Sequence, residues 1–416
     1  PMRTAGIICE YNPFHRGHAW HLAQTKRLLG ENTAIVCVMS GHWTQQADCA
    51  IADKWTRARL ALMGGADLVL ELPTPWAAAS AETFARGGVE VLAATGVVDV
   101  LSFGSECGDV EALQRAAACL DAPEYPAALR VRLEQGKPFA ACRQAAVEAL
   151  AGPESASLLR KANNNLGVEY IRAIRALDAR MTPMTVLRRG APHNSMGGMD
   201  TRREDGAAGA GTVDRMQFAS ATEIRWNLLE GRWDRAEPYL LPGARERLED
   251  SLIGLPALKR VEQVMLARVR TMTAEDWAAL PDSGASEGLP ERLVRAGRRA
   301  ESIPAFYAQA NTRRYTEARV RRLLLWAFLG LTKADRPAHV PYLRVLGLNE
   351  RGGGLLRRMK QAASLPVITK PARARALEAE GRTLFELEGR CTDLYGLCFA
   401  RPRPCALEWT SSPVVC

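Results

Sequence analysis

The chain has 416 residues, of which 24% are charged and 47% hydrophobic, which suits two or three folded domains and excludes a disordered chain. No apolar run approaches the ~20 residues that a membrane span needs, and no basic and then apolar leader opens the sequence, so we expect a cytoplasmic protein without a membrane partner. The ten cysteines are scattered without a Cys-x-x-Cys pair, which favours reduced thiols and predicts no metal site.

The positive charge is concentrated in the second part of the chain. Residues 241–416 hold 29 Lys and Arg against 19 Asp and Glu, whereas residues 1–240 hold 26 against 27. This division is typical of a near-neutral catalytic domain joined to a module that binds a polyanion. The alternative is an arginine-biased genome that decorates a helical surface.

A short buried strand, Ala5–Cys9, leads into the run Glu10-Tyr11-Asn12-Pro13-Phe14-His15-Arg16-Gly17-His18. The Asn-Pro pair predicts a turn, and a helix is expected from His18. A strand that feeds a helix N-terminus is a natural phosphate site, because free N–H groups and the helix dipole face the anion. His15 and His18 are therefore candidates to donate hydrogen bonds to phosphate oxygens as charge builds at an α-phosphorus, with Gly17 allowing close approach. Two exposed turn histidines are the alternative.

Apolar runs alternate with amphipathic stretches up to about residue 120. The predicted strands are Ala5–Cys9, Ala34–Met39, Asp67–Leu72 and Val97–Ser102, and the predicted helices are His18–Leu29, Ile51–Met63 and Ala77–Ala94. Met184–Leu187, which ends in Arg188-Arg189, is a fifth strand. This alternation predicts an α/β fold, a Rossmann-like parallel sheet with helices on both faces. Ligands bind such sheets at the carboxyl ends of the strands.

Three further segments are candidates for phosphate binding or closure of a site. Asp53-Lys54-Trp55-Thr56-Arg57 opens the second helix and could direct Lys54 or Arg57 at phosphate, although a capped surface helix explains the pattern equally well. Ser220-Ala221-Thr222-Glu223-Ile224-Arg225 is a hydroxyl-rich helix start with an arginine one turn in, and an ordinary Ser-capped helix is its alternative. Residues 196–211 lack apolar periodicity and are interpreted as a loop that could act as a lid.

Strand signals nearly vanish after residue 237. Helical periodicity covers Leu252–Met272, Glu291–Ala300, Tyr315–Gly330, Leu355–Ala363 and Ala372–Glu388, while Leu346-Gly347 and Arg351-Gly352-Gly353-Gly354 are predicted turns. The densest basic patch consists of Arg313, Arg314, Arg319, Arg321 and Arg322. We therefore divide the chain into a catalytic domain, residues 1–236, and a basic, mostly α-helical domain, residues 237–416, that contacts nucleic acid phosphates.

The order of a strand-linked His-x-Gly-His, a Phe-Gly-Ser-Glu strand end and a Ser-x-Thr-x-Ile-Arg helix start resembles the HIGH-type nucleotidyltransferases. Within them the chain is similar to the tRNA(Met) cytidine acetate ligase family. The runs that carry this resemblance are Glu10–His15, Asp53–Arg57, Gly65–Pro73, Asn163–Gly167, Arg313–Thr316 and Leu365–Lys370. They span nearly the whole chain, and their combination is specific although each run alone is weak.

The resemblance implies an enzyme that joins acetate and ATP into acetyl-adenylate and pyrophosphate. The acetyl group then passes to the exocyclic amine of the wobble cytidine in elongator tRNA(Met), giving N4-acetylcytidine. It implies catalytic roles for His15 and His18 and a magnesium ion carried with ATP, for which Glu10 and Glu106 are weak candidate contacts. The ATP site that it implies, completed by the helix start at Ser220, comprises Ile8, Cys9, Glu10, Tyr11, Asn12, Pro13, Phe14, His15, Arg16, Gly17, His18, His21, Gly104, Asn163, Arg188, Arg189, Ser220, Thr222 and Arg225.

One segment departs from the family pattern. After Ser40-Gly41 the family usually carries Gln-Arg-Gly-Glu-Pro, whereas this chain has Gln45-Gln46-Ala47-Asp48-Cys49. Two other functions stay open at this point. One is an adenylyltransferase that acts on a small phosphorylated metabolite, and the other is a non-catalytic tRNA-binding protein with a relic nucleotide site. A class I aminoacyl-tRNA synthetase is disfavoured because no Lys-Met-Ser-Lys-Ser-like loop is present.

Overall fold

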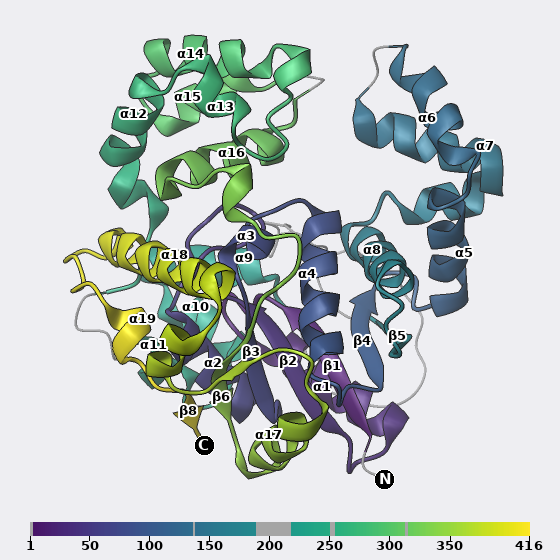
Figure 1. Ribbon diagram of the computed structural model, residues 1–416, viewed down its shortest axis with the longest axis vertical. Coiled ribbons are helices and arrows are strands. Elements are labelled where there is room, and N and C mark those ends of the chain that lie inside the picture. The colour runs from purple at the N-terminus through teal and green to yellow at the C-terminus, as the bar shows by residue number, and fades with distance from the viewer. Residues whose placement is uncertain (1–2, 136–137, 189–217, 250–253, 313–314) are drawn as a thin grey trace, which may run out of the picture.

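The computed structural model describes residues 3–135, 138–188, 218–249, 254–312 and 315–416. Eight strands among these residues form one sheet in the order β5-β4-β1-β2-β3-β6-β7, with β8 paired to β6 (Figure 1). The strands are β1 (Thr4–Cys9), β2 (Ala34–Ser40), β3 (Leu68–Leu72), β4 (Val100–Ser105), β5 (Thr182–Leu187), β6 (Leu343–Leu348), β7 (Val367–Ile368) and β8 (Val414–Val415). Predicted residues Arg189, Arg313, Arg314 and the loop 196–211 lie outside the described residues.

Strands β1 to β5 are mutually parallel, which confirms the predicted Rossmann-like sheet. Strands β1, β2 and β3 are buried on both faces, as expected for strands covered on each side by helices, whereas β5 at the edge of the sheet is partly exposed. The order reverses beside β1, because β2 and β3 extend to one side of it and β4 and β5 to the other. In such sheets a crevice opens at this point, outside the carboxyl ends of the strands.

Alternate strand residues face two separate cores. Ile7, Cys9 and Cys37 pack toward one face, whereas Ile8 and Val38 pack toward the other. The first face is covered by α1 (Arg16–Leu29), α2 (Lys54–Met63), α9 (Ala221–Leu229), α10 (Trp233–Ala236) and α11 (Ala244–Glu249). The second is covered by α3 (Thr74–Ala77), α4 (Ala81–Ala94) and α8 (Ala162–Ala176).

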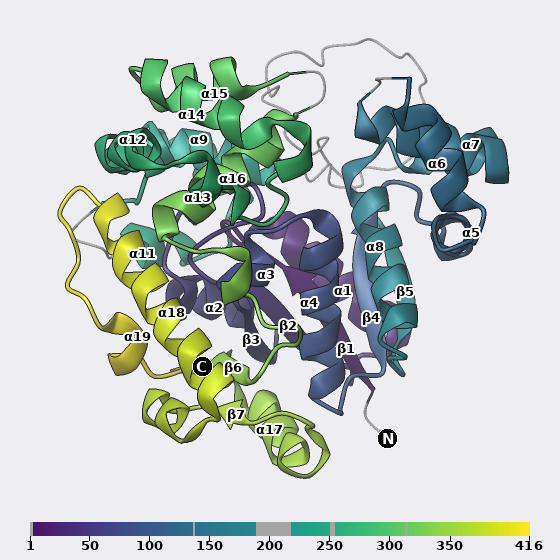
Figure 2. The same cartoon turned by 45° about the horizontal axis from the view of Figure 1, so that its top comes forward.

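Two groups of helices project from the carboxyl-end side of the sheet (Figures 1 and 2). The first group is α5 (Val110–Leu120), α6 (Tyr125–Leu133) and α7 (Phe139–Leu158). The second group, here called the basic bundle, is α12 (Glu262–Thr271), α13 (Ala274–Ala278), α14 (Leu289–Arg299), α15 (Ile303–Ala310) and α16 (Glu317–Leu329). The basic bundle is fixed to the sheet domain through Trp326, whose Nε1 donates to the Ala78 carbonyl at 2.7 Å.

The chain returns to the sheet after the basic bundle. Strand β6 pairs antiparallel with β3, followed by α17 (Glu350–Ala362), α18 (Ala379–Tyr395) and α19 (Leu407–Thr410). The turns predicted at Leu346-Gly347 and Arg351–Gly354 are therefore wrong. These glycines serve close packing: a Cβ on Gly347 would lie 3.1 Å from Leu62 Cδ1, and one on Gly352 would lie 2.0 Å from the Asp67 carbonyl oxygen. Residues 237–416 thus supply part of the sheet as well as helices.

All ten cysteines are free thiols in this fold. Within the described ranges, no helix combines the length and the apolar character required to cross a bilayer.

Candidate active site

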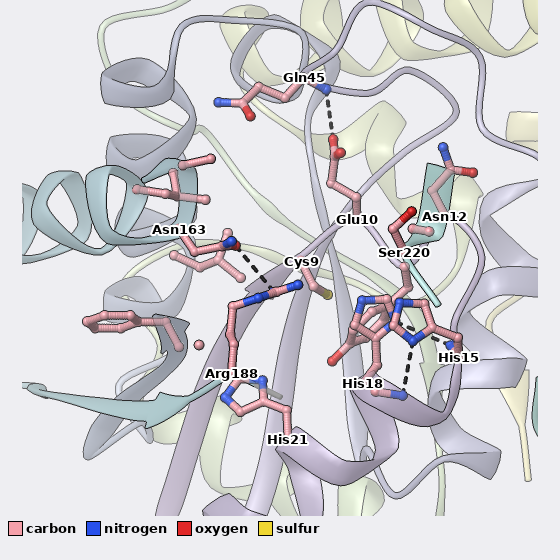
Figure 3. Close-up of a pocket in the computed structure, with 18 of the residues that line it drawn as sticks. Cys9, Glu10, Asn12, His15, His18, His21, Gln45, Asn163, Arg188 and Ser220 are labelled. Carbon is pink, nitrogen blue, oxygen red and sulfur yellow. Dashed lines mark hydrogen bonds between the residues drawn. The ribbon is translucent and has the colours of Figure 1, made fainter. Parts of the chain in front are cut away.

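A cavity of about 400 Å³ opens at the carboxyl ends of β1, β4 and β5, beside the reversal of strand order (Figure 3). The resemblance-derived residues that line it are Ile8, Cys9, Glu10, Tyr11, Asn12, His15, Gly17, His18, His21, Gly104, Asn163, Arg188, Ser220, Thr222 and Arg225. Segments far apart in the sequence therefore meet in one pocket.

Helix α1 points its N-terminus at this pocket. It begins at Arg16 with His15 as its cap, two residues earlier than predicted. His15 Nδ1 accepts from the Gly17 N–H at 3.0 Å, and His18 Nδ1 accepts from the His15 N–H at 3.3 Å. A Cβ on residue 17 would lie 2.8 Å from His15 Cε1, so glycine permits this cap. The first turn carries no acidic residue, so the positive end of the helix dipole is left for an anion.

The same hydrogen bonds define how the two imidazoles are protonated. Because both Nδ1 atoms accept from backbone N–H groups, the neutral rings carry their protons on Nε2. Burial, with Arg188 and Arg225 nearby, lowers the pKa of His15 to about 3. Burial and the neighbouring His15 lower the pKa of His18 well below its ordinary value. Near neutral pH both rings are therefore uncharged and have Nε2–H groups with which to donate to a phosphate oxygen.

Three members of the predicted run do not line the cavity. Phe14 is fully buried and packs edge-on against Tyr11, with ring centroids 4.7 Å apart. Arg16 donates to the Leu240 carbonyl at 3.2 Å, away from the pocket. Pro13 lies in the turn just before Phe14. These residues shape and anchor the turn, so the run of ATP contacts implied by the resemblance is broader than the lining of the cavity.

His21 lies one turn further along α1 and lines the pocket. Its Nε2 is 3.1 Å from Ser102 Oγ, which in turn is 2.7 Å from Thr25 Oγ1. Burial, with Arg188 nearby, lowers the pKa of His21 to about 4. His21 therefore connects α1 to strand β4 as a neutral ring.

Arg188 reaches across the end of β4 from the end of β5 (Figure 3). Its Nη1 donates to Asn163 Oδ1 at 3.3 Å, and Asn163 Nδ2 donates to Glu106 Oε1 at 2.7 Å. A Cβ on Gly104 would lie 3.0 Å from Arg188 Cγ, so glycine gives the arginine its path. Burial raises the pKa of Glu106, but hydrogen bonds from Asn163 and Asn164 outweigh this effect and lower it below the ordinary value. Glu106 is thus an ionised, hydrogen-bonded anchor for the arginine.

The helix start predicted at Ser220 is confirmed as the N-terminus of α9. Ser220 Oγ accepts from the Glu223 N–H at 3.1 Å. Arg225 Nη1 donates to the Asn12 carbonyl at 2.7 Å, and its Nη2 donates to Thr222 Oγ1 at 3.2 Å. Arg225 thereby joins α9 to the turn before α1. A phosphate contact by this segment stays a prediction.

The suggestion that Lys54 or Arg57 faces phosphate is wrong. Lys54 is fully buried and its Nζ lies 2.6 Å from both Glu71 Oε1 and Glu408 Oε2. The Arg57 guanidinium donates to the carbonyls of Glu10, Ser40 and Gly41 at the ends of β1 and β2. Of the alternative, a capped surface helix, the cap is confirmed, because Asp53 accepts from the Thr56 N–H at 2.8 Å, but its surface position is wrong, because most of α2 is buried.

Sequence reasoning missed much of the pocket wall. The additional lining residues with large or polar side chains are Trp20, Thr44, Gln45, Gln46, Asp48, Phe84, Phe103, Asn165, Leu166, Tyr170 and Phe218. Phe103 and Tyr170 form an aromatic pair with centroids 5.6 Å apart. A signal existed for both, since Phe103 precedes Gly104 directly and Tyr170 lies two helical turns after Asn163.

The predicted RNA contacts that the structure describes lie on α16 of the basic bundle. Arg319 Nε donates to the Asp282 carbonyl at 2.7 Å, and Arg321 Nη1 lies 3.5 Å from Glu317 Oε1. Burial lowers the pKa of Arg322. These arginines pack on the bundle as well as carrying charge, so their role toward RNA stays a prediction.

No cluster of three or more His, Cys, Asp or Glu among the described residues could hold a metal ion. Glu106 is committed to Asn163 and Asn164, and one oxygen of Glu10 is committed to the Gln45 N–H. Glu10 and Glu106 therefore offer too few oxygens to hold a divalent cation by themselves. They fit a cation that is already bound to the phosphate oxygens of a nucleotide.

Comparison with known proteins gives one consistent result. The family model described as HIGH Nucleotidyl Transferase matches residues 2–407. A tRNA(Met) cytidine acetate ligase from Caldanaerobacter subterraneus is 34% identical, covering 96% of each chain, and one from Acetivibrio thermocellus is 32% identical, covering 100% of each.

The solved structures agree with the sequence comparisons. Thermotoga maritima TmcAL without ligand superposes with a TM-score of 0.89 at 30% identity, covering 100% of this chain and 99% of that one. Its form bound with alpha-thio ATP superposes with a TM-score of 0.86 over the same shares. The chain therefore belongs to the HIGH nucleotidyl transferase family and, within it, to the tRNA(Met) cytidine acetate ligases.

Proposed function

We propose that this chain is an ATP-dependent ligase that acetylates the wobble cytidine of elongator tRNA(Met) at N4, through an acetyl-adenylate. The observation that carries the proposal is the pair of Nε2–H donors of His15 and His18 at the uncompensated N-terminus of α1. The relatives named tRNA(Met) cytidine acetate ligase support tRNA(Met) as the substrate, and the Thermotoga structure bound with alpha-thio ATP supports ATP as the nucleotide.

In the first step an acetate oxygen attacks the α-phosphorus of ATP and pyrophosphate leaves. The transition state gathers charge on the phosphate oxygens, and positioned donors in a pocket shielded from water stabilise that charge. His15 and His18 supply neutral N–H donors, while Arg188 and Arg225 supply positive charge from β5 and α9. A magnesium ion that enters with ATP would neutralise part of the pyrophosphate charge.

The nucleoside end of ATP would lie against β4. Gly104 allows a ligand to approach the strand end, Phe103 and Tyr170 offer an aromatic wall for a base, and Asn163 offers an amide. This arrangement leaves the phosphates directed toward α1.

In the second step the cytidine amine attacks the acetyl carbonyl carbon and AMP leaves. The base has to be turned out of its stack to enter the pocket. Residues 43–49, here called the pocket loop, follow β2 and contribute Thr44, Gln45, Gln46 and Asp48 to the cavity wall. We place the approach of the base on the side of the basic bundle, because Trp43 at the start of this loop packs edge-on against Phe328 of α16, with centroids 5.9 Å apart. Such an enzyme would work in the cytoplasm, where its tRNA is found.

Pyrophosphate release from ATP, measured with acetate and tRNA(Met) each present or absent, tests the proposal. We expect acetate-dependent release and N4-acetylcytidine by mass spectrometry of the tRNA nucleosides. Replacing one transition-state donor should cost about 10²–10³-fold in rate, so His18→Ala should lower release to that extent. His339→Ala is the matched control, because His339 is exposed and pairs only with Glu90 among the described residues.

The two remaining alternatives give different results in the same assay. An adenylyltransferase would release pyrophosphate with a phosphorylated metabolite but not with acetate. A non-catalytic tRNA-binding protein would bind tRNA(Met) without any carboxylate-dependent release.

A further inference from the structure

Two carboxylates, Glu10 and Asp48, line the pocket and have no role in the first step. Glu10, at the end of β1, accepts with Oε1 from the Gln45 N–H at 2.7 Å and from Ser40 Oγ at 3.5 Å. Its second oxygen, Oε2, takes part in no hydrogen bond with the part of the chain that the structure describes, and Glu10 lines the cavity. One oxygen therefore fixes the side chain while the other remains available to a substrate.

Glu10 is directed away from the phosphate-binding end of the pocket. Its carboxylate extends toward Gln45, whereas His15 and His18 lie on the other side of the Glu10 backbone (Figure 3). A carboxylate repels both phosphate and acetate, so a role in holding either anion is disfavoured. A group that is neutral or gains a proton is the better match for this position.

The Glu10 backbone is held rigidly. The buried Arg57 guanidinium donates to the Glu10 carbonyl and also to Ser40 and Gly41 on the neighbouring strand. The loop that supplies Gln45 begins at Trp43, which contacts Phe328 of the basic bundle. Glu10 thus lies at the wall of the pocket from which we expect the cytidine to enter.

We propose that Glu10 is the catalytic base of the acetyl-transfer step, a role that rests on the proposed function. The cytidine N4 attacks the acetyl carbonyl carbon, a C–N bond forms, the C–O bond to AMP breaks, and AMP leaves as its phosphate anion. The attacking nitrogen then bears a surplus proton, which passes to Glu10 Oε2 and later to water. A positioned base of this kind contributes about 10²–10⁴-fold to a rate.

The charged and titratable groups around Glu10 fit such a base. Against the effect of burial, the hydrogen bond from the Gln45 N–H, Arg225 of α9 and Arg57 of α2 lower its pKa, and Tyr170 of α8 and Asp48 of the pocket loop are the other titratable side chains nearby. Burial is the largest effect and raises the pKa of Glu10 above its ordinary value, which makes the carboxylate a stronger base. Glu106 is unsuited, because both its oxygens accept hydrogen bonds from residues 163 and 164.

Separate measurement of the two steps in Glu10→Gln tests this assignment. Glutamine keeps a carbonyl oxygen for the Gln45 N–H but cannot take up a proton. Acetate-dependent ATP–pyrophosphate exchange reports adenylate formation, and N4-acetylcytidine formation under single turnover reports transfer. We expect transfer to fall by about 10²-fold or more, and by at least ten times more than exchange. The wild-type transfer rate should rise with pH through the titration of Glu10, and this rise should vanish in the variant.

Asp48→Asn tests the competing carboxylate on the same wall and should keep the pH-dependent rise. Equal losses of exchange and transfer in Glu10→Gln would overturn the assignment and make Glu10 a structural residue. A wild-type pH profile in Glu10→Gln would overturn it as well, by pointing to another base. Failure of the proposed function is distinguishable, because the wild-type protein itself would then show neither acetate-dependent exchange nor N4-acetylcytidine.

Discussion

Helices α1 and α2 follow neighbouring parallel strands and both begin with side chains that can bind phosphate, yet only α1 faces the pocket. Helix α1 is capped by a neutral histidine and has no acidic residue in its first turn. Helix α2 is capped by the Asp53 carboxylate, and its Lys54 and Arg57 are turned into the protein. The same sequence signal therefore leads to a candidate ligand site at α1 and to buried contacts within the protein at α2.

The difference shows what makes a helix N-terminus available to an anion. A carboxylate cap accepts from a free N–H and also compensates the helix dipole with its negative charge, whereas a neutral imidazole cap accepts from an N–H but leaves the dipole uncompensated. The cations of α2 already have partners within the protein. Lys54 pairs with Glu71 and Glu408, and Arg57 donates to three backbone carbonyls. A donor without a partner in the protein, rather than a basic residue as such, is therefore the better indicator of a candidate phosphate site.

The largest effect is expected from Lys54→Met. Removal of one partner from a buried ion pair leaves uncompensated charge on Glu71 and Glu408 and typically costs 3–5 kcal/mol, so we expect the free energy of unfolding to fall by about 4 kcal/mol. Urea unfolding followed by tryptophan fluorescence measures this change. Arg245→Met, which breaks exposed ion pairs to Glu237 and Glu249, is the control and should cost under about 1 kcal/mol.

An unchanged stability of Lys54→Met, together with a raised KM for ATP, would contradict this comparison. That result would indicate that Lys54 of α2 contacts the phosphates of ATP after all.

A smaller effect is expected from pH, through the histidines of α1. The pKa values of His15 and His21 are lowered to about 3 and about 4 by burial and by Arg188, against an ordinary value of 6.5. Between pH 6.5 and about 4 the unfolded chain therefore binds protons that the folded protein does not. The free energy of unfolding should fall as the pH is lowered through this window, by on the order of 2 kcal/mol for each histidine.

Urea unfolding at pH 7 and pH 4.5 measures this dependence. The double variant His15→Asn with His21→Gln should make the pH dependence clearly shallower, while His339→Ala should leave it unchanged. His18 and His42, whose pKa values burial also lowers, keep contributing in all these proteins. A double variant with the wild-type slope would mean that the histidines of α1 are accessible to water.

The smallest effect on stability is expected from a substitution in the loop between β2 and α2. Ala47 has φ 58°, a left-handed conformation that favours glycine, and it occupies the position where the family usually carries glycine. The left-handed conformation costs a residue with a Cβ roughly 1–2 kcal/mol, part of which glycine loses again through its freedom in the unfolded chain. Ala47→Gly should therefore raise the free energy of unfolding by up to about 1 kcal/mol, visible as a higher melting temperature. A lower melting temperature would show that the Cβ makes a stabilising contact.

Strands β1 and β2 are nearly continuous apolar runs, the signal of a buried parallel strand, and β3 to β5 contain polar residues but still carry short apolar runs that alternate with helical stretches. Strand β6 was not predicted, because its sequence Leu-Arg-Val-Leu-Gly-Leu follows a long helical region and its Leu-Gly pair was interpreted as a turn. Arg344 is buried there beside Glu408, with 3.6 Å between Nε and Oε1, and Gly347 packs against Leu62. Both features depend on partners distant in sequence, which local patterns cannot show.

In the candidate site, too, the features set by local sequence were predictable and those set by distant partners were not. His15 and His18 were predictable because cap, glycine and helix lie in one short run. The roles of Lys54 and Arg57 were not, since the choice between phosphate and protein partners depends on Glu408 and on the paired ends of β1 and β2. The approach of the Gln45 N–H to Glu10 was equally hidden, because it depends on the path of the loop after β2.

The antiparallel pairing of β6 with β3 has a consequence for how the protein forms during synthesis. Strands β1 to β5 leave the ribosome long before β6, so β3 remains an unpaired edge while the basic bundle is being made. Contacts between segments so distant in sequence form late and slowly. Transcripts truncated before residue 343 should therefore yield chains that self-associate through the apolar edge of β3, and folding in the cell should depend on chaperones until β6 arrives.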